Sequence, residues 1–267
     1  MIDYLSLTCQ LPPDKDYMEY HGKITEDSFR SQMYKFMCQI ERARILYYPH
    51  KFGDSTNAAM PFTNIILNPK YYICYEEMVD CLFSIFDTSD LIFEDFNISG
   101  IHLASDIDTV NVETVIATLH VKRIRLSTFR IIKGTIYAGA NPKSRIYNKL
   151  KEIEDRMKGG KRVTEEEKGL LELYKVLTRF EIAIGSPGMN LSELREKATS
   201  LVSYFDRLEF IRATCDSPCG VMQYMYRHMN RKFRQEVAEL KDKDFVEKIK
   251  NTYSSGVDKW FEQNEPF

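Results

Sequence analysis

The sequence lacks the features that mark secreted and membrane-spanning proteins. No segment approaches the roughly 18 consecutive apolar residues of a transmembrane helix. The opening residues, MIDYLSLTCQLPP, include Asp3 and no basic lead, which is not the pattern of a secretory signal. The six cysteines are scattered, and the close pair Cys215 and Cys219 has no second pair or histidine at zinc-binding spacing. We therefore expect a soluble intracellular protein with buried thiols and no membrane partner.

The chain also lacks an excess of positive charge. It carries 37 Lys and Arg against 39 Asp and Glu, a net charge of −2, so binding to nucleic acid would need local basic patches. Two stretches have that character: residues 120–133, with five Lys and Arg and no acid, and a later predicted helix with arginines at i, i+4 and i+7. The alternative is a charged face in contact with solvent. The candidate DNA-binding residues are Lys122, Arg123, Arg125, Arg130, Arg145, Arg227, Arg231 and Arg234.

What is present is the pattern of a mixed α and β protein. Short runs of alternating or aromatic residues predict strands, and helical spacing appears at residues 75–86, 112–120 and 149–175. The last of these breaks at Gly159 and Gly160 and restarts at a capping box of Thr164 and Glu167. We expect an α+β fold with an antiparallel central sheet and helices on one face. Residues 1–200 would form the first domain, and residues 201–267 a helical C-terminal region.

The stretch SRIYNKLKE, residues 144–152, has the pattern of a strand that runs into a helix. In an extended segment Arg145, Tyr147 and Lys149 share one face. A phenol, with a pKa near 10 in water, is a poor nucleophile at neutral pH unless positive charge stabilises the phenolate. Two cations flank this one, so Tyr147 is a candidate nucleophile. The alternative is a tyrosine on an amphipathic strand between two solvated charges.

Two more predicted strands place ionisable groups on one face and apolar groups on the other. His102 and Asp106 share a face of ISGIHLASDID, and Arg179 and Glu181 share a face of VLTRFEIAI. Each could instead be an ordinary sheet histidine or a solvated charge. If the strands pair, these groups can form a site for Mg²⁺ or Mn²⁺, where a metal would polarise a phosphodiester while Tyr147 attacks phosphorus. The candidate ligands are His102, Asp106, Glu181 and Glu152.

The motif TIYAGANPKSRIYNKLKE, followed by LTRFEIAI, resembles the replication-initiator family of rolling-circle plasmids, and it is similar to the replication endonucleases of filamentous phages. The resemblance covers about residues 98 to 200. Those proteins nick one DNA strand through a tyrosine, stay linked to the 5′ phosphate and leave a 3′ hydroxyl. It implies a fold like that of the HUH endonucleases, with residues 1–200 as the catalytic domain.

Carried over residue by residue, the resemblance implies Tyr147 as nucleophile and Lys149 and Arg179 as catalytic residues, with Glu152 and Glu181 at the positions of the family glutamates. The family usually has an aspartate where this chain has His102, and Asp106 takes the second acidic position. His102 and Asp106 can both bind a metal ion, but the geometry of the metal site need not be that of the family.

The function implied is a metal-dependent, site-specific single-strand endonuclease and ligase that initiates rolling-circle DNA replication. Its expected partners are single-stranded or supercoiled origin DNA, a host helicase and polymerase, and a second copy of the chain, in the cytoplasm of a bacterial host cell. Two alternatives stay open: a relaxase-like or transposase-like nuclease of a mobile element, and a non-catalytic DNA-binding module. Termination could use Tyr137 or a water activated by a carboxylate.

Overall fold

The computed structural model describes residues 1–26, 33–49, 61–86, 92–121, 129–210 and 241–262. The chain divides into two compact units, each assembled from separate stretches of sequence. Unit 1 comprises Met1, Leu103–Ala183 and Ser200–Gly256, and unit 2 comprises Ile2–His102, Ile184–Thr199 and Val257–Phe267. The predicted boundary at residue 200 stays a prediction. None of the helices in the described part of the chain has the length and apolar character to span a bilayer.

Unit 2 is built on antiparallel strands in the order β2-β3-β4-β5-β1. Burial alternates along β3, β4 and β5, as it does when one face of a sheet meets a core and the other meets solvent. In the sequence these strands stand out as short apolar and aromatic runs. The strands are β1 (Ile2–Cys9), β2 (Lys23–Glu26), β3 (Tyr34–Gln39), β4 (Ala43–Pro49) and β5 (Thr63–Leu67).

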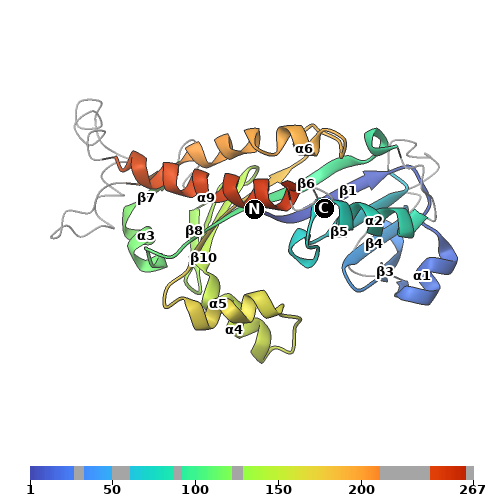
Figure 1. The fold of residues 1–267 in the computed structure, drawn as a ribbon, viewed down its shortest axis with the longest axis horizontal. Coiled ribbons are helices and arrows are strands. Elements are labelled where there is room, and N and C mark those ends of the chain that lie inside the picture. The colour runs from blue at the N-terminus through green and yellow to red at the C-terminus, as the bar shows by residue number, and fades with distance from the viewer. Residues whose placement is uncertain (27–32, 50–60, 87–91, 122–128, 211–240, 263–267) are drawn as a thin grey trace. The chain divides into compact units, whose positions relative to one another are not determined.

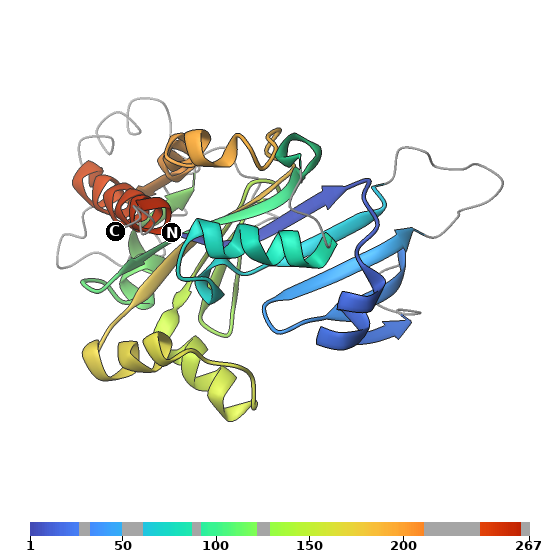
Figure 2. The ribbon, with the colours of Figure 1, turned by 45° about the vertical axis from the view of Figure 1, so that its right-hand side comes forward.

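Helices cover the apolar face of this sheet. Met18 of α1 (Lys15–His21) is buried, and its carbonyl accepts a hydrogen bond from Sγ of Cys38 on β3. The predicted helix at residues 75–86 is confirmed as α2 (Tyr75–Phe86). Figure 2 shows both helices on the same side of the strands. Shorter helical elements of this unit are η1 (Pro69–Tyr71), η2 (Phe93–Asp95) and α6 (Leu194–Lys197).

The strands of unit 1 follow the order β6-β11-β10-β9-β8, and β6 and β11 have residues in both units. Strands β8 and β9 are joined by a two-residue turn, Lys133 and Gly134, with φ values of 50° and 78°. Positive φ at both positions matches the twist of a tight hairpin. The strands are β6 (Asn97–Ile107), β8 (Phe129–Ile132), β9 (Thr135–Ala138), β10 (Lys143–Asn148) and β11 (Thr178–Gly185).

A helical hairpin connects β10 to β11, as the sequence predicted. Helix α4 (Lys149–Lys158) begins where the side chain of Asn148 accepts a hydrogen bond from the backbone N–H of Lys151. Helix α5 (Glu165–Leu173) begins at the predicted capping box of Thr164 and Glu167. One expectation was wrong: Lys149 is the first helical residue and does not lie on the strand face beside Tyr147, because Asn148 already caps the helix.

Two of the remaining elements, β12 (Leu208–Phe210) and α9 (Lys243–Glu262), contact the apolar side of the sheet of unit 1. Phe180 of β11 is fully buried, and its ring centroid lies 5.8 Å from those of Phe210 and Phe245. In Figures 1 and 2 helix α9 and the α4–α5 hairpin lie on different sides of β10. The elements are α3 (Val112–Thr118), β7 (Leu119–Val121), η4 (Ser200–Arg207), β12 (Leu208–Phe210) and α9 (Lys243–Glu262).

The predicted α+β class with a large antiparallel sheet is confirmed. The expectation that the helices lie on one face was wrong for unit 1, because α9 and the α4–α5 hairpin lie on different sides of β10 (Figures 1 and 2). The predicted helical C-terminal region, residues 201–267, is interrupted by β12, whose residues pair with β7 in a separate two-stranded sheet. Leu208, Glu209 and Phe210 are all buried, so the residues on both faces of this short strand are covered. Three residues are too few for alternation to distinguish a strand from a helix in the sequence. Within this region Lys243–Glu262 form the helix α9.

Candidate functional site

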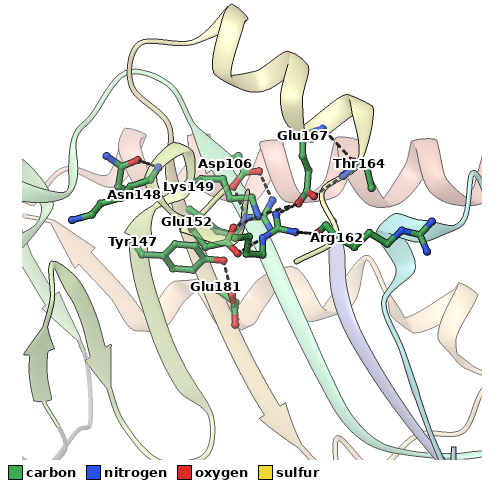
Figure 3. Close-up of polar contacts among 12 residues, drawn as sticks. Asp106, Tyr147, Asn148, Lys149, Glu152, Arg162, Thr164, Glu167 and Glu181 are labelled. Carbon is green, nitrogen blue, oxygen red and sulfur yellow. Dashed lines mark hydrogen bonds and ion pairs between the residues drawn. The ribbon is translucent and has the colours of Figure 1, made fainter. Parts of the chain in front are cut away.

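Tyr147 and Glu181 form the centre of the site, on neighbouring strands of unit 1. The antiparallel register of β10 and β11 aligns Arg145 with Glu181 and Tyr147 with Arg179. Aligned residues point to the same face of a sheet, so the predicted meeting of these two polar faces is confirmed. The hydroxyl of Tyr147 donates a hydrogen bond to Oε2 of Glu181, 3.2 Å away (Figure 3). Tyr147 is 6% exposed and Glu181 is 2% exposed.

Arg145 supplies positive charge on the same side. Its Nη1 lies 3.4 Å from Oε1 of Glu181, and its guanidinium carbon lies 4.6 Å from the centre of the Tyr147 ring. A cation over a phenol ring is attracted to the ring, and it stabilises negative charge that develops on the oxygen. The phenol therefore lies between a carboxylate that can take a proton and a guanidinium that can offset the resulting charge.

Arg179 and Asp106 form a second pair on this face. Nε of Arg179 lies 2.7 Å from Oδ1 of Asp106, and Nη2 lies 2.6 Å from Oδ2. The Arg179 side chain is buried, so this is a bidentate pair of the strong kind. Asp106 thus joins β6 to β11 on the ionisable face, as its strand position predicted.

Lys149 belongs to a network within the α4–α5 hairpin. Its Nζ lies 2.8 Å from Glu152 and 3.5 Å from Glu167, and the side chain is buried. Arg156 contacts the same two carboxylates, at 2.6 Å and 2.5 Å. Burial lowers the pKa of Arg156, but the hydrogen bond to Glu167 and the charge of Glu152 outweigh it and raise the pKa above its usual value. The network ties α4 to α5 at the base of the hairpin (Figure 3).

A pocket of about 430 Å³ opens beside Tyr147. Its wall includes Tyr137 and Arg145 from the sheet, Glu152 and Arg156 from α4, and the β8–β9 turn. Tyr137 is aligned with Arg145 in the β9–β10 register, and the Nζ of Lys143 lies 4.9 Å from its ring centre. Tyr147 lines this pocket although its side chain is largely buried.

Each of the four predicted metal ligands contacts other side chains of the protein. Asp106 and Glu152 each contact an arginine, and Glu181 contacts Arg145 and Tyr147. His102 lies in unit 2, where its ring stacks on Tyr4 with centroids 4.4 Å apart. No group of three or more His, Cys, Asp and Glu side chains in the described ranges is arranged to hold a metal ion. The divalent cation and the approach of His102 to Glu181 therefore stay predictions from the sequence.

The predicted DNA-binding residues are described only in part. Arg130 is exposed on β8, and Arg145 lines the pocket. The remaining six lie outside the described residues: Lys122, Arg123, Arg125, Arg227, Arg231 and Arg234. Of the thiols, Cys9, Cys38 and Cys74 are buried as expected, and Cys81 is partly exposed. Cys215 and Cys219 lie outside the described residues.

The sequence interpretation missed Arg156 and the second role of Glu167. Arg156 lies four residues after Glu152 on a predicted helix, and that spacing is the signal for an ion pair on one helical face. Glu167 was recognised only as part of a capping box. Its contacts with Lys149 and Arg156 depend on how the hairpin folds back, which local spacing does not encode.

The interpretation of this site rests on its own residues and contacts. The chain matches no protein-family model and no curated protein with which it was compared.

Proposed function

We propose that this chain is a tyrosine-dependent DNA nicking and joining enzyme that initiates rolling-circle replication. The observation that carries the proposal is the hydrogen bond from Tyr147 to the buried carboxylate of Glu181, beside a pocket and under the guanidinium of Arg145. A nucleophile needs a base within hydrogen-bond reach and a cation for the developing charge. Tyr147 has both neighbours.

In the proposed step the phenol oxygen of Tyr147 attacks the phosphorus of a DNA phosphodiester, and the phenol proton passes to Oε2 of Glu181. The bond from phosphorus to the 3′ oxygen breaks, and that oxygen takes a proton from solvent to become a free 3′ hydroxyl. The 5′ phosphate stays on the tyrosine. Joining is the reverse reaction, in which a 3′ hydroxyl attacks the phosphotyrosine and Glu181 returns the proton to the phenol.

The other residues have supporting roles in this proposal. Arg145 offsets charge on the phenol and on the phosphate oxygens, and the pair of Arg179 and Asp106 holds β6 against β11. Lys149, through its buried contacts with Glu152 and Glu167, fixes the helix that forms one wall of the pocket. The family resemblance adds an HUH-like fold, origin DNA, a host helicase and polymerase, a homodimer and a bacterial cytoplasm to the proposal.

The experiment is adduct formation on a single-stranded oligonucleotide that carries the origin of the source replicon. Wild-type protein should yield a covalent protein–DNA species that survives denaturing electrophoresis. Tyr147→Phe should yield none and should still bind the oligonucleotide. Tyr174→Phe makes the same chemical change at the end of α5, away from the pocket residues, and should keep the adduct. An adduct in Tyr147→Phe would show that another residue is the nucleophile.

A non-catalytic DNA-binding module is the second candidate. The observation in its favour is that Asp106, Glu152 and Glu181 all contact cationic side chains of the protein. Each carboxylate therefore already has a cationic partner in place of a metal ion. Such a module would bind DNA with the salt dependence of phosphate contacts and would form no adduct under any divalent cation. The same oligonucleotide assay, run with and without Mn²⁺, therefore separates the two candidates.

A further inference from the structure

Three exposed lysines line the pocket beside Tyr147 and form its rim. Lys133 belongs to the basic stretch of residues 120–133, and the other two were not candidate site residues in the sequence. Lys133 lies in the β8–β9 turn, Lys151 in the first turns of α4, and Lys161 in the connection between α4 and α5. All three are exposed and line the pocket. None forms an ion pair with another residue of the described ranges.

The charge around the pocket differs in sign from that of the whole chain. Five cationic and three acidic side chains line it, whereas the chain carries a net charge of −2. Glu152 pairs with Arg156, and Arg145 pairs with Glu181, so the remaining charges that line the pocket are three lysines against Glu113 and Asp155. A chain with no global positive field binds a polyanion through a local patch, and this rim is such a patch.

The three lysines also come from separate segments, so they lie around the opening and not along one helix. The turn that carries Lys133 is held in one conformation by positive φ at Lys133 and Gly134. Lys151 is held by the capped start of α4. A strand of nucleic acid whose phosphate lay at Tyr147 would place its neighbouring phosphates near this rim.

We infer that Lys133, Lys151 and Lys161 bind the backbone phosphates on either side of the phosphate attacked by Tyr147. The partner is single-stranded DNA, whose flexible backbone can enter a pocket of this size and whose phosphates carry the charge that the rim complements. The inference rests on the proposed function, since it places the scissile phosphate at Tyr147. Ammonium groups suit this role because they contact phosphates of any sequence.

The test is the salt dependence of binding to a labelled single-stranded oligonucleotide, measured by fluorescence anisotropy. It uses the full chain with Tyr147→Phe, which prevents a covalent adduct from distorting the equilibrium. The added changes are Lys133→Gln, Lys151→Gln and Lys161→Gln together. The control carries Lys158→Gln, Lys168→Gln and Lys175→Gln, which remove the same charge from the same unit outside the pocket.

We expect the rim variant to lower the slope of log affinity against log salt by about 2, at about 0.7 per phosphate contact in single strands. Between 50 and 200 mM salt the parent protein should then lose about 20-fold more affinity than the rim variant. The control should keep the parent slope. Equal slopes in the rim variant and the parent, with unchanged melting temperatures, would overturn the inference.

Its failure is distinguishable from failure of the proposed function. If the chain with Tyr147 intact forms an adduct while the rim variant keeps the parent slope, the lysines are not phosphate contacts and the nicking function stands. If the chain forms no adduct while the rim variant loses slope, the lysines bind DNA and the tyrosine chemistry is wrong.

Discussion

The hydroxyl of Tyr147 donates its hydrogen bond across two neighbouring strands to a carboxylate, Glu181, that is 2% exposed. A buried carboxylate without a partner would be costly, and here the phenol and Arg145 both compensate it. The register of β10 and β11 sets this contact, because it places the two side chains diagonally on one face. The same pair of strands thus fixes the positions of the proposed nucleophile, Tyr147, and of the proposed proton acceptor, Glu181.

Replacing Glu181 by Gln should slow adduct formation by roughly 10²–10⁴-fold, the usual contribution of a general base. The amide can still accept the hydrogen bond from Tyr147 but cannot take its proton. The measurement is the single-turnover rate on the origin oligonucleotide, with DNA affinity measured in parallel. Glu172→Gln removes a charge from an exposed position of α5 and should leave the rate unchanged. A rate in Glu181→Gln equal to that of wild type would assign the base elsewhere.

Glu167 has two separable roles, and two substitutions distinguish them. Glu167→Gln keeps a side chain that can complete the capping box with Thr164 but removes the negative charge shared by Lys149 and Arg156. Breaking such a buried network costs about 3 kcal/mol or more. Thr164→Ala removes the cap alone, which costs about 1 kcal/mol. Urea denaturation should therefore show the larger loss of unfolding free energy in Glu167→Gln. A loss in Thr164→Ala with no loss in Glu167→Gln would mean that only the cap matters.

The divalent cation has its own test. We expect EDTA to stop adduct formation and Mn²⁺ to restore it, because a metal neutralises charge on the phosphate oxygens as they are attacked. Asp106→Asn should raise the Mn²⁺ concentration needed for half-maximal rate. Asp108→Asn is the matched control, since Asp108 lies two residues on and is half exposed near Lys248. If adducts still form in EDTA, the Lys and Arg side chains of the protein neutralise the charge on the phosphate oxygens without a metal ion.

Glu77 should give the protein an acid-sensitive contribution to stability in unit 2. Burial raises its pKa, but hydrogen bonds from the backbone of Ile73 and from Arg42 outweigh this and leave the pKa below its usual value. A depressed pKa stabilises the fold above the unfolded value of about 4.3, and the contribution is lost as the pH falls through the folded value. Glu77→Gln should therefore cost about 1 kcal/mol at pH 7 and less at pH 3, by urea denaturation. A cost that is the same at both pH values would contradict this.

Much of the site was predictable because strand alternation is a local rule. The assignment of Arg145, Tyr147, Arg179 and Glu181 to one face needed only the period of two, and the register confirmed that the faces meet. The rule failed at Lys149, because Asn148 caps helix α4 and Lys149 is already the first residue of that helix. Asn148 is a residue type that commonly caps helices, and it was the signal that the strand ends before Lys149.

The role of the hairpin was not predictable in the same way. Its two helices and its capping box follow from Gly159, Gly160, Thr164 and Glu167, all of which act on neighbouring backbone. The contact of Glu167 with Lys149 joins residues 18 positions apart and exists only when α5 folds back on α4. The pocket rim likewise draws lysines from three segments whose proximity no local pattern encodes.

The amino-acid sequence by itself determined which side chains share a strand face, where the helices begin, and that a tyrosine stands beside cations. These are properties of neighbours along the chain, fixed by backbone geometry. Only the tertiary structure decided which carboxylate receives the hydrogen bond of Tyr147, which cations engage each acid, and where the pocket opens. Those outcomes depend on strand register and on the return of a hairpin, and they join residues that the sequence keeps far apart.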